Sequence, residues 1–411
     1  MTNNPRQNKP AAETAIDRKE SVSLVEPMLL GQTCPARSRL MDLSVELAKK
    51  SASFRRSLPP SLLASTATLL RAMNCYYSNL IEGNYTHPVD IERALISDYN
   101  ADPKKRDLQL EAKSHMAVQQ WIDEGALKGK AATVESVRQI HQRFYLNMPE
   151  ILQWVEDPDT KERFQVVPGE WRHRDVQVGR HVPISPGAVP RFMERFEEAY
   201  ARLGPSEVIL SAAAAHHRLA WIHPFLDGNG RVMRLMSHAM LLDVLDTGAL
   251  WSVSRGLARK VNDYKRHLAQ CDLTRRNDLD GRGNLSEEAL VDFTEFFLNT
   301  CLDQVNFMES LLQPDQLRAR ILIWADEEIR QGSLLPKAKI ILDALLRHGE
   351  LQRGEIPEML GVGERMSRNV VANLSLKGVI SSASTRAPLR LAFPAALASR
   401  WVPGLFPEQT L

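Results

Sequence analysis

Apolar residues recur at three- and four-residue steps along most of the chain, which is the period of a helix with one buried face. The pattern is clear where Leu40, Leu43 and Leu47 follow one another, and again at Leu69 and Met73. Further helices are expected over residues 192–203, 208–222, 231–245, 256–271 and 287–312. The pattern therefore predicts an all-α protein.

The helical period stops between residues 151 and 190. The run FQVVPGEWRHRDVQVGRHVPISPGAVP alternates β-branched and polar residues around Gly179, and its prolines prevent a helix. We expect a short β-hairpin in this segment.

The two ends of the chain differ from the middle. Residues 1–30 are polar and predict a flexible leader. From residue 337 a helix, a short helix, a turn at 361–363, a third helix and two β-like segments follow one another. That order is typical of a winged helix.

These changes of pattern divide the chain into six parts. They are a leader over 1–30, an N-terminal helical region over 31–130, a central helical core over 131–312, a linker helix over 313–336, a winged helix over 337–397 and a tail over 398–411.

Charge and composition exclude some classes of protein. The 411 residues carry 52 Lys+Arg against 50 Asp+Glu, so only a local patch could attract nucleic acid or an anionic membrane. The sequence shows neither a membrane-spanning apolar run nor a signal peptide, and its 4 cysteines form no C-x-x-C pair. We expect a cytoplasmic protein that does not bind membranes and has no disulfide framework.

The residues best suited to chemistry lie in the run HPFLDGNGRVMR, from His223 to Arg234, between two strongly apolar helices. Gly228 and Gly230 allow close backbone approach, and the loop leads into a helix whose N-terminal N–H groups can bind phosphate. Arg231 and Arg234 are three residues apart and could hold further phosphate oxygens. The run therefore predicts a phosphate site.

Three other side chains of this loop add reactive groups. Asp227 offers the hard oxygen that Mg²⁺ prefers, Asn229 can donate to an oxyanion, and His223 can accept a proton from an attacking hydroxyl. Two other interpretations use some of the same residues. One is a simple helix-capping turn, and the other is a zinc site that adds His216 and His217, which would leave the glycines and arginines unexplained.

The run matches H-P-F-x-[DE]-G-N-G-R-x-x-R, and the chain resembles the Fic family over roughly residues 38–310. Members of this family transfer AMP from ATP to hydroxyl side chains of proteins. The resemblance implies that the central part is a Fic core, with His223 as general base and Asp227 as Mg²⁺ ligand. It also implies nucleotide contacts for Asp227, Gly228, Asn229, Gly230, Arg231 and Arg234.

A second motif, SNLIEGN from Ser78 to Asn84, resembles the inhibitory pattern [ST]-x-x-x-E-[GN] of autoinhibited Fic proteins. In such proteins a helix carries a glutamate that pairs with the last arginine of the loop. The resemblance implies that Ser78 and Glu82 belong to an inhibitory helix and that Glu82 pairs with Arg234. The alternative is a solvated glutamate at a helix end.

The expected hairpin resembles the family's flap, which holds the target backbone and covers the nucleotide. Val176, Gln177, Val178 and Gly179 would line it. Tyr264 matches a Tyr-x-x-x-Leu pattern whose tyrosine borders the adenine in relatives.

The resemblance thus implies a Mg²⁺- and ATP-dependent protein adenylyltransferase that modifies Tyr, Thr or Ser of a target protein or of itself. Three alternatives stay open: a nucleotide-sensing DNA-binding regulator, an enzyme that uses another phosphate-containing donor, and an enzyme that removes AMP. Residues 337–395 contain nine Lys/Arg and five Asp/Glu. This mild excess suits DNA, a docking protein or the second copy of a homodimer.

Overall fold

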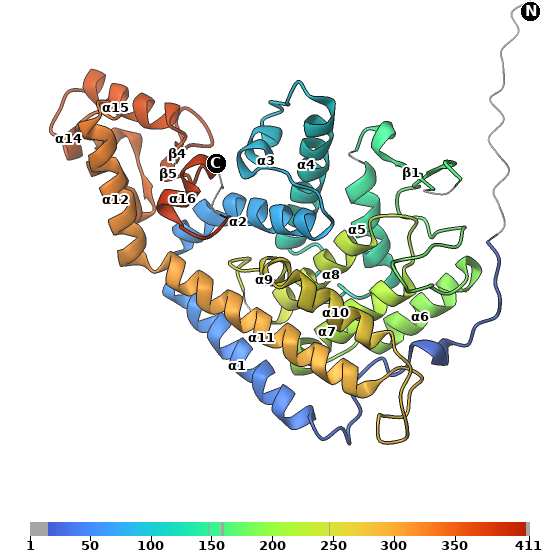
Figure 1. Ribbon diagram of the computed structural model, residues 1–411. Coiled ribbons are helices and arrows are strands. Elements are labelled where there is room, and N and C mark those ends of the chain that lie inside the picture. The colour runs from blue at the N-terminus through green and yellow to red at the C-terminus, as the bar shows by residue number, and fades with distance from the viewer. Residues whose placement is uncertain (1–14, 147, 158–159, 246, 408–411) are drawn as a thin grey trace, which may run out of the picture.

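The computed structural model describes residues 15–146, 148–157, 160–245 and 247–407. Within these ranges the chain forms sixteen α-helices and five short strands (Figure 1). The all-α class predicted from the apolar period is confirmed. None of the helices in these ranges is long and apolar enough to cross a membrane.

The centre of the molecule is the pair α7 (Pro205–Ile222) and α8 (Asn229–Leu245). Both helices carry apolar residues on nearly every side and are buried along most of their length, because neighbours cover them all round. The long helices α1 (Arg37–Ser57) and α11 (Glu287–Leu312) lie side by side and pack on α7, while α5 (Val134–Leu146) packs on α8 (Figure 1). This packing fixes the loop that joins α7 to α8.

The helix α2 (Pro60–Ile81) passes close to this centre and packs on α4 (Pro103–Asp123), which also contacts α8. The C-terminal end of α2 and the middle of α4 therefore lie beside the start of α8. The smaller helices of this part are α3 (Pro88–Leu95) and α6 (Val189–Tyr200).

The helix expected over 256–271 is in fact two, α9 (Val253–Arg259) and α10 (Val261–Cys271). The chain bends at Lys260, whose φ and ψ of −115° and 36° leave the helical region.

The expected hairpin forms in the first part of residues 151–190. Strands β1 (Trp154–Glu156) and β2 (Arg163–Gln165) are antiparallel, with Val155 opposite Phe164. Around Gly179 there is a tight turn closed by a single bridge between Val178 and His181. The prediction of a short β-hairpin between residues 151 and 190 is therefore confirmed, with both strands before Gly179.

The expected leader is not flexible throughout. Residues 1–14 lie outside the described ranges, but Val25, Met28 and Leu30 are buried against the core, around the short 3-10 helix η1 (Val22–Val25). The polar side chains that suggested a leader are partners of the core, as in the ion pair between Asp17 and Arg191. For residues 15–30 the prediction is wrong because pairing, rather than apolar burial alone, holds the segment.

The C-terminal region has the expected order of elements. They are α12 (Pro314–Arg330), α13 (Ala338–His348), β3 (Glu350–Leu351), α14 (Ile356–Leu360), α15 (Glu364–Leu376), β4 (Ile380–Ser381), β5 (Leu389–Leu391) and α16 (Ala398–Trp401). Short 3-10 helices complete the chain: η2 (Glu150–Leu152), η3 (Pro186–Ala188), η4 (Arg353–Glu355) and η5 (Ala395–Leu397). The three strands form an antiparallel sheet in the order β3-β5-β4.

This region packs against α2 and α3 (Figure 1). The Tyr77 hydroxyl of α2 donates to the backbone oxygen of Leu405 (3.1 Å), and the backbone N–H of Ala395 donates to Glu92 of α3 (2.9 Å). The C-terminal region and the α7–α8 centre therefore contact the same helix, α2.

Candidate active site

The loop between α7 and α8 begins with a backbone that is unusual for its residue type. His223 follows α7 with φ 50° and ψ 61°, a left-handed conformation that a side chain disfavours. Such a conformation persists where the surroundings determine it. Arg172 fixes this conformation of His223. Its backbone N–H donates to the backbone oxygen of Pro224 (2.9 Å), and its Nε donates to the backbone oxygen of His223 (2.8 Å).

Arg172 also ties this loop to the segment that follows β2. Its Nη1 donates to the backbone oxygen of Arg174 (2.9 Å), and its Nη2 donates to that of Ile184. Burial lowers the pKa of Arg172 to about 10, so the side chain stays charged at neutral pH. Sequence reasoning missed this residue, since it is one of several arginines in an irregular segment.

Asn229 closes the loop from its other end. Its Oδ1 accepts from the Phe225 N–H (2.9 Å), and its Nδ2 donates to the Phe225 oxygen (2.8 Å). The Phe225 ring stacks on His141 with centroids 3.9 Å apart. Asn229, expected to donate to an oxyanion, is therefore engaged in holding the loop in shape.

The His223 ring is held as a neutral base. Its Nδ1 lies 3.3 Å from the oxygen of Ala220, and since a carbonyl only accepts, Nδ1 carries the proton and Nε2 keeps a lone pair. Burial lowers the pKa of His223 to about 4, and this effect outweighs the Ala220 contact, which raises the pKa. At neutral pH the ring can accept a proton.

His223 lines a groove of about 1130 Å³ on the side of the β1–β2 hairpin. The four expected flap residues, Val176, Gln177, Val178 and Gly179, line the same groove. The structure thus brings the four expected flap residues and the candidate base to the same groove.

Asp227 lies on the other side of the loop, facing α5. The Tyr145 hydroxyl donates to its Oδ2 (2.5 Å), and Nη2 of Arg231 lies 3.3 Å from the same oxygen. Burial raises the pKa of Asp227, but Arg231 and Tyr145 outweigh this effect and lower it below its usual value. The carboxylate is ionised and its side chain is 46% exposed, so it is accessible to a cation. Tyr145 was not among the residues expected from the sequence.

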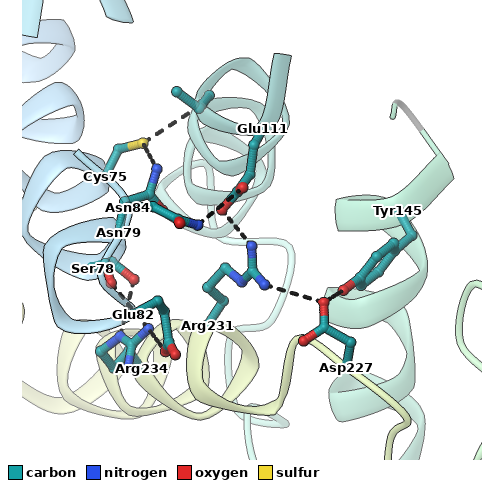
Figure 2. A network of polar contacts seen from close by, with 11 residues as sticks. Cys75, Ser78, Asn79, Glu82, Asn84, Glu111, Tyr145, Asp227, Arg231 and Arg234 are labelled. Atoms are coloured by element: carbon teal, nitrogen blue, oxygen red, sulfur yellow. Dashed lines mark hydrogen bonds and ion pairs between the residues drawn. The ribbon is translucent and has the colours of Figure 1, made fainter. Parts of the chain in front are cut away.

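Arg234 points back toward the end of α2 and is buried, with 2% of its side chain exposed. Its Nη2 donates to Glu82 Oε1 (2.5 Å) and to the Ser78 backbone oxygen (3.2 Å), and its Nε donates to Ser78 Oγ (2.9 Å) (Figure 2). Burial raises the pKa of Glu82, but the charge and the hydrogen bond of Arg234, together with the charge of Arg231, lower that pKa overall. Ser78 and Glu82, at the C-terminal end of α2, thus bind the last arginine of the loop.

The two loop glycines are needed for space. Gly228 has a φ of 79°, and a Cβ there would meet the Tyr145 ring at 2.9 Å. A Cβ on Gly230 would lie 2.1 Å from Glu82 Oε1. Glu82 therefore lies on the first turn of α8 as well as beside Arg234.

Arg231 has a carboxylate partner of its own, which the sequence did not reveal. Its Nη1 donates to Glu111 of α4, and its guanidinium lies over the Phe144 ring, 5.0 Å from the centroid. In Figure 2 the Arg231 guanidinium lies between Glu111 and Asp227, while Glu82 and Ser78 surround Arg234.

Tyr264 does not border an open pocket in this structure. It is 1% exposed, and its hydroxyl lies 2.7 Å from His216 Nε2, in a core next to Phe293. The expectation of a direct adenine contact is therefore not supported, because the ring is packed inside the helical core.

The alternative zinc site is not formed either. His216 is bonded to Ser237 and Tyr264, and His217 to Asp272 and Arg218. Among the described residues no group of three or more metal-binding side chains comes together.

These features define an α-helical domain in which a loop at a helix N-terminus carries a partly buried neutral histidine and two arginines. Residues 131–241 match the model of the Fic/DOC family, and the chain therefore contains a Fic domain.

Several curated relatives carry the name "Protein adenylyltransferase Fic". That of Drosophila erecta is 28% identical over 220 residues, covering 50% of this chain and 41% of the relative. That of Drosophila willistoni is 31% identical over 172 residues, covering 41% and 31%. The chain thus spans less than half the length of these relatives.

A solved structure of a Fic family protein from Desulfovibrio desulfuricans G20 has the same fold. The TM-score is 0.50 at 18% identity, and the alignment covers 89% of this chain and 98% of that one.

Proposed function

We propose that this protein is a protein adenylyltransferase that transfers AMP from ATP to a Tyr, Thr or Ser hydroxyl. The observation that carries the proposal is the loop itself, which places a neutral histidine, an ionised aspartate and two arginines around a helix N-terminus. The names of the curated relatives support the same activity.

The proposed reaction begins with a target hydroxyl in the groove beside His223. Nε2 of His223 accepts the hydroxyl proton, and the oxygen attacks the α-phosphorus of ATP. The bond between the α-phosphorus and the bridging oxygen of the β-phosphate breaks, so pyrophosphate leaves with that electron pair. The N–H groups at the start of α8 and Arg231 stabilise the negative charge on the phosphate oxygens.

The site also fits Mg²⁺. Asp227 is ionised, half exposed and close to the phosphate-binding helix N-terminus, and such a carboxylate beside substrate phosphates is a usual Mg²⁺ ligand. When bound there, the cation would neutralise phosphate charge.

We further propose that Glu82 inhibits the enzyme. Its carboxylate lies against Gly230 and pairs with Arg234, so it occupies the space and the guanidinium that an ATP phosphate would need. ATP would then bind with its phosphate chain misplaced for in-line attack.

We also propose that the C-terminal region is a winged helix whose role is regulatory rather than catalytic. DNA binding has weaker support, because several of its basic residues are paired within the chain. These pairs are Arg368 with Glu364, Lys377 with Glu328, and Arg390 with Glu350.

The test is to incubate the Glu82→Gly variant with MgCl₂, a host lysate and ATP labelled on either the α- or the γ-phosphate. Label retained on protein from α-labelled ATP alone is the expected result. Label from γ-labelled ATP would indicate phosphorylation, and no label from either would refute the proposal. Parallel α-labelled GTP, CTP and UTP test whether another donor is preferred.

A further inference from the structure

Both arginines of the loop are held by glutamates, yet the two contacts differ in kind. Arg234 is held by Glu82, whose side chain is 34% exposed. Arg231 is held by Glu111, and in this pair the side chains are only 11% and 13% exposed. A nearly dry ion pair fixes its geometry more firmly than one that is open to solvent.

The positions relative to the loop also differ. A Cβ on Gly230 would meet Glu82 and Arg234, and a Cβ on Gly228 would meet Tyr145. Glu111 is not among these neighbours. It reaches Arg231 from α4.

Arg231 retains donors that its protein partners do not use. Its Nη1 serves Glu111 and its Nη2 faces Asp227 Oδ2 at 3.3 Å. Its Nε is buried and has no hydrogen-bond partner among the described residues. An unsatisfied buried donor next to an anion-binding loop suits a phosphate oxygen.

The carboxylates of Glu111 and Asp227 both attract the positive charge of Arg231. The two carboxylates lie on opposite sides of one guanidinium (Figure 2). Without Glu111 the full charge of Arg231 would act on Asp227, and a shorter ion pair between them would compete with a cation for the Asp227 oxygens.

We propose that Glu111 is a positioning residue, which holds Arg231 away from Asp227 so that Arg231 can bind phosphate and Asp227 can bind Mg²⁺. This inference rests on the proposed function, and it gives the two glutamates opposite effects. Glu82 blocks the site, whereas Glu111 prepares it.

The test uses Glu111→Gln in the full-length Glu82→Gly protein. We expect transfer to fall by about tenfold or more at fixed Mg²⁺, with part of the loss recovered at high Mg²⁺. Binding of Mn²⁺ in the presence of ADP, followed by electron paramagnetic resonance, should weaken by a similar factor. The shorter Glu111→Asp should restore part of both, and it remains informative if the glutamine variant does not fold.

The matched control is Asp107→Asn. Asp107 lies one turn earlier on α4 and lines the same cavity of about 430 Å³ as Glu111, but it makes no hydrogen bond to either loop arginine within the described residues. Asp107→Asn removes one negative charge, as Glu111→Gln does. We expect it to change transfer and Mn²⁺ binding less than twofold.

Three results would overturn the inference. They are increased transfer in Glu111→Gln, unchanged Mn²⁺ binding in a folded Glu111→Gln protein, and an equal effect of Asp107→Asn. The Mn²⁺ measurement needs no transfer reaction, so a failure of the proposed function and a failure of the role of Glu111 can be told apart.

Discussion

The carboxylate of Glu82 lies so close to Gly230 that a methyl group on that glycine would come within 2.1 Å of Oε1. The same oxygen accepts from Arg234 at 2.5 Å. One side chain from the end of α2 therefore covers the first turn of α8 and occupies a loop arginine.

Removing this side chain should activate the enzyme. We expect Glu82→Gly to raise transfer and self-labelling on the order of 10- to 100-fold, because a charge-assisted hydrogen bond contributes ~1.5–3 kcal/mol and 1.4 kcal/mol is about tenfold. Partial exposure of Glu82 favours the lower end of this range. The measurement is the initial rate of label transfer from α-labelled ATP.

The chain offers a matched control for this substitution. Glu124 follows α4 as Glu82 follows α2, with nearly the same backbone (φ −75°, ψ 2° against φ −80°, ψ −4°) and a glycine after it. Glu124→Gly should leave transfer unchanged. Equal rates for wild type and Glu82→Gly would mean that Glu82 is only a residue at a helix end.

His223→Ala should abolish transfer and leave nucleotide binding nearly intact. Loss of a general base lowers the rate by a factor of about 10² to 10⁴, and the His223 ring contributes little to the proposed phosphate site. Because the pKa of His223 is lowered to about 4, transfer by Glu82→Gly should fall only as the pH drops toward 4, and not near 6.5. A rate that halves near pH 6.5, with binding unchanged, would contradict the neutral state of this base.

The molecule should lose stability in mild acid. Burial lowers the pKa of His115, His141 and His216 to about 3, and that of His217 and His223 to about 4. Below pH 6.5 these histidines bind protons in the unfolded chain but stay neutral in the folded chain. Each histidine therefore lowers the free energy of unfolding by up to about 1.4 kcal/mol per pH unit, until the pH reaches its folded pKa. Urea unfolding should give a clearly lower free energy at pH 5.5 than at pH 7.5. A flat profile between these values would show that the histidines protonate without unfolding.

The sequence predicted the loop well because its parts are contiguous. Histidine, aspartate, glycines and arginines fall within twelve residues, and the apolar period of the flanking helices predicts that both are buried. The contact between Glu82 and Arg234, 152 residues apart, came only from the resemblance to a known motif. No local pattern connects them.

The residues that were missed are distant in sequence and ordinary in type. Glu111 reaches Arg231 across 120 residues, Tyr145 reaches Asp227 across 82, and Arg172 reaches His223 across 51. A glutamate or a tyrosine on an amphipathic helix looks the same whether it faces solvent or a loop. Only tertiary packing decides, as it does for Tyr264, which the helical core buries.

The C-terminal region should influence inhibition through α2. The Phe406 ring packs edge-on against Tyr76 (5.6 Å between centroids), next to the Tyr77 bond to Leu405 and about one and a half turns before Glu82. Phe406→Ala should loosen this end of α2 and raise wild-type transfer a few fold, yet have no effect in Glu82→Gly. Leu376→Ala, on the exposed surface of α15, should change neither. Equal effects of Phe406→Ala in both backgrounds would assign the residue to the fold or to target binding instead.

Gly230→Ala tests the contact between Glu82 and Gly230 directly, through stability. Alanine normally stabilises a helix relative to glycine by up to ~1 kcal/mol. Any loss of stability in Gly230→Ala must therefore come from contacts with neighbouring residues. The flexible end of Glu82 can move aside, but it then gives up Arg234, which should cost ~1–3 kcal/mol.

We therefore expect Gly230→Ala to destabilise the wild type and to be neutral or stabilising in the Glu82→Gly background. Chemical unfolding of the four proteins measures the difference. The same change in both backgrounds would show that Glu82 does not rest on the first turn of α8 in solution, and the inhibitory contact would have to be sought elsewhere.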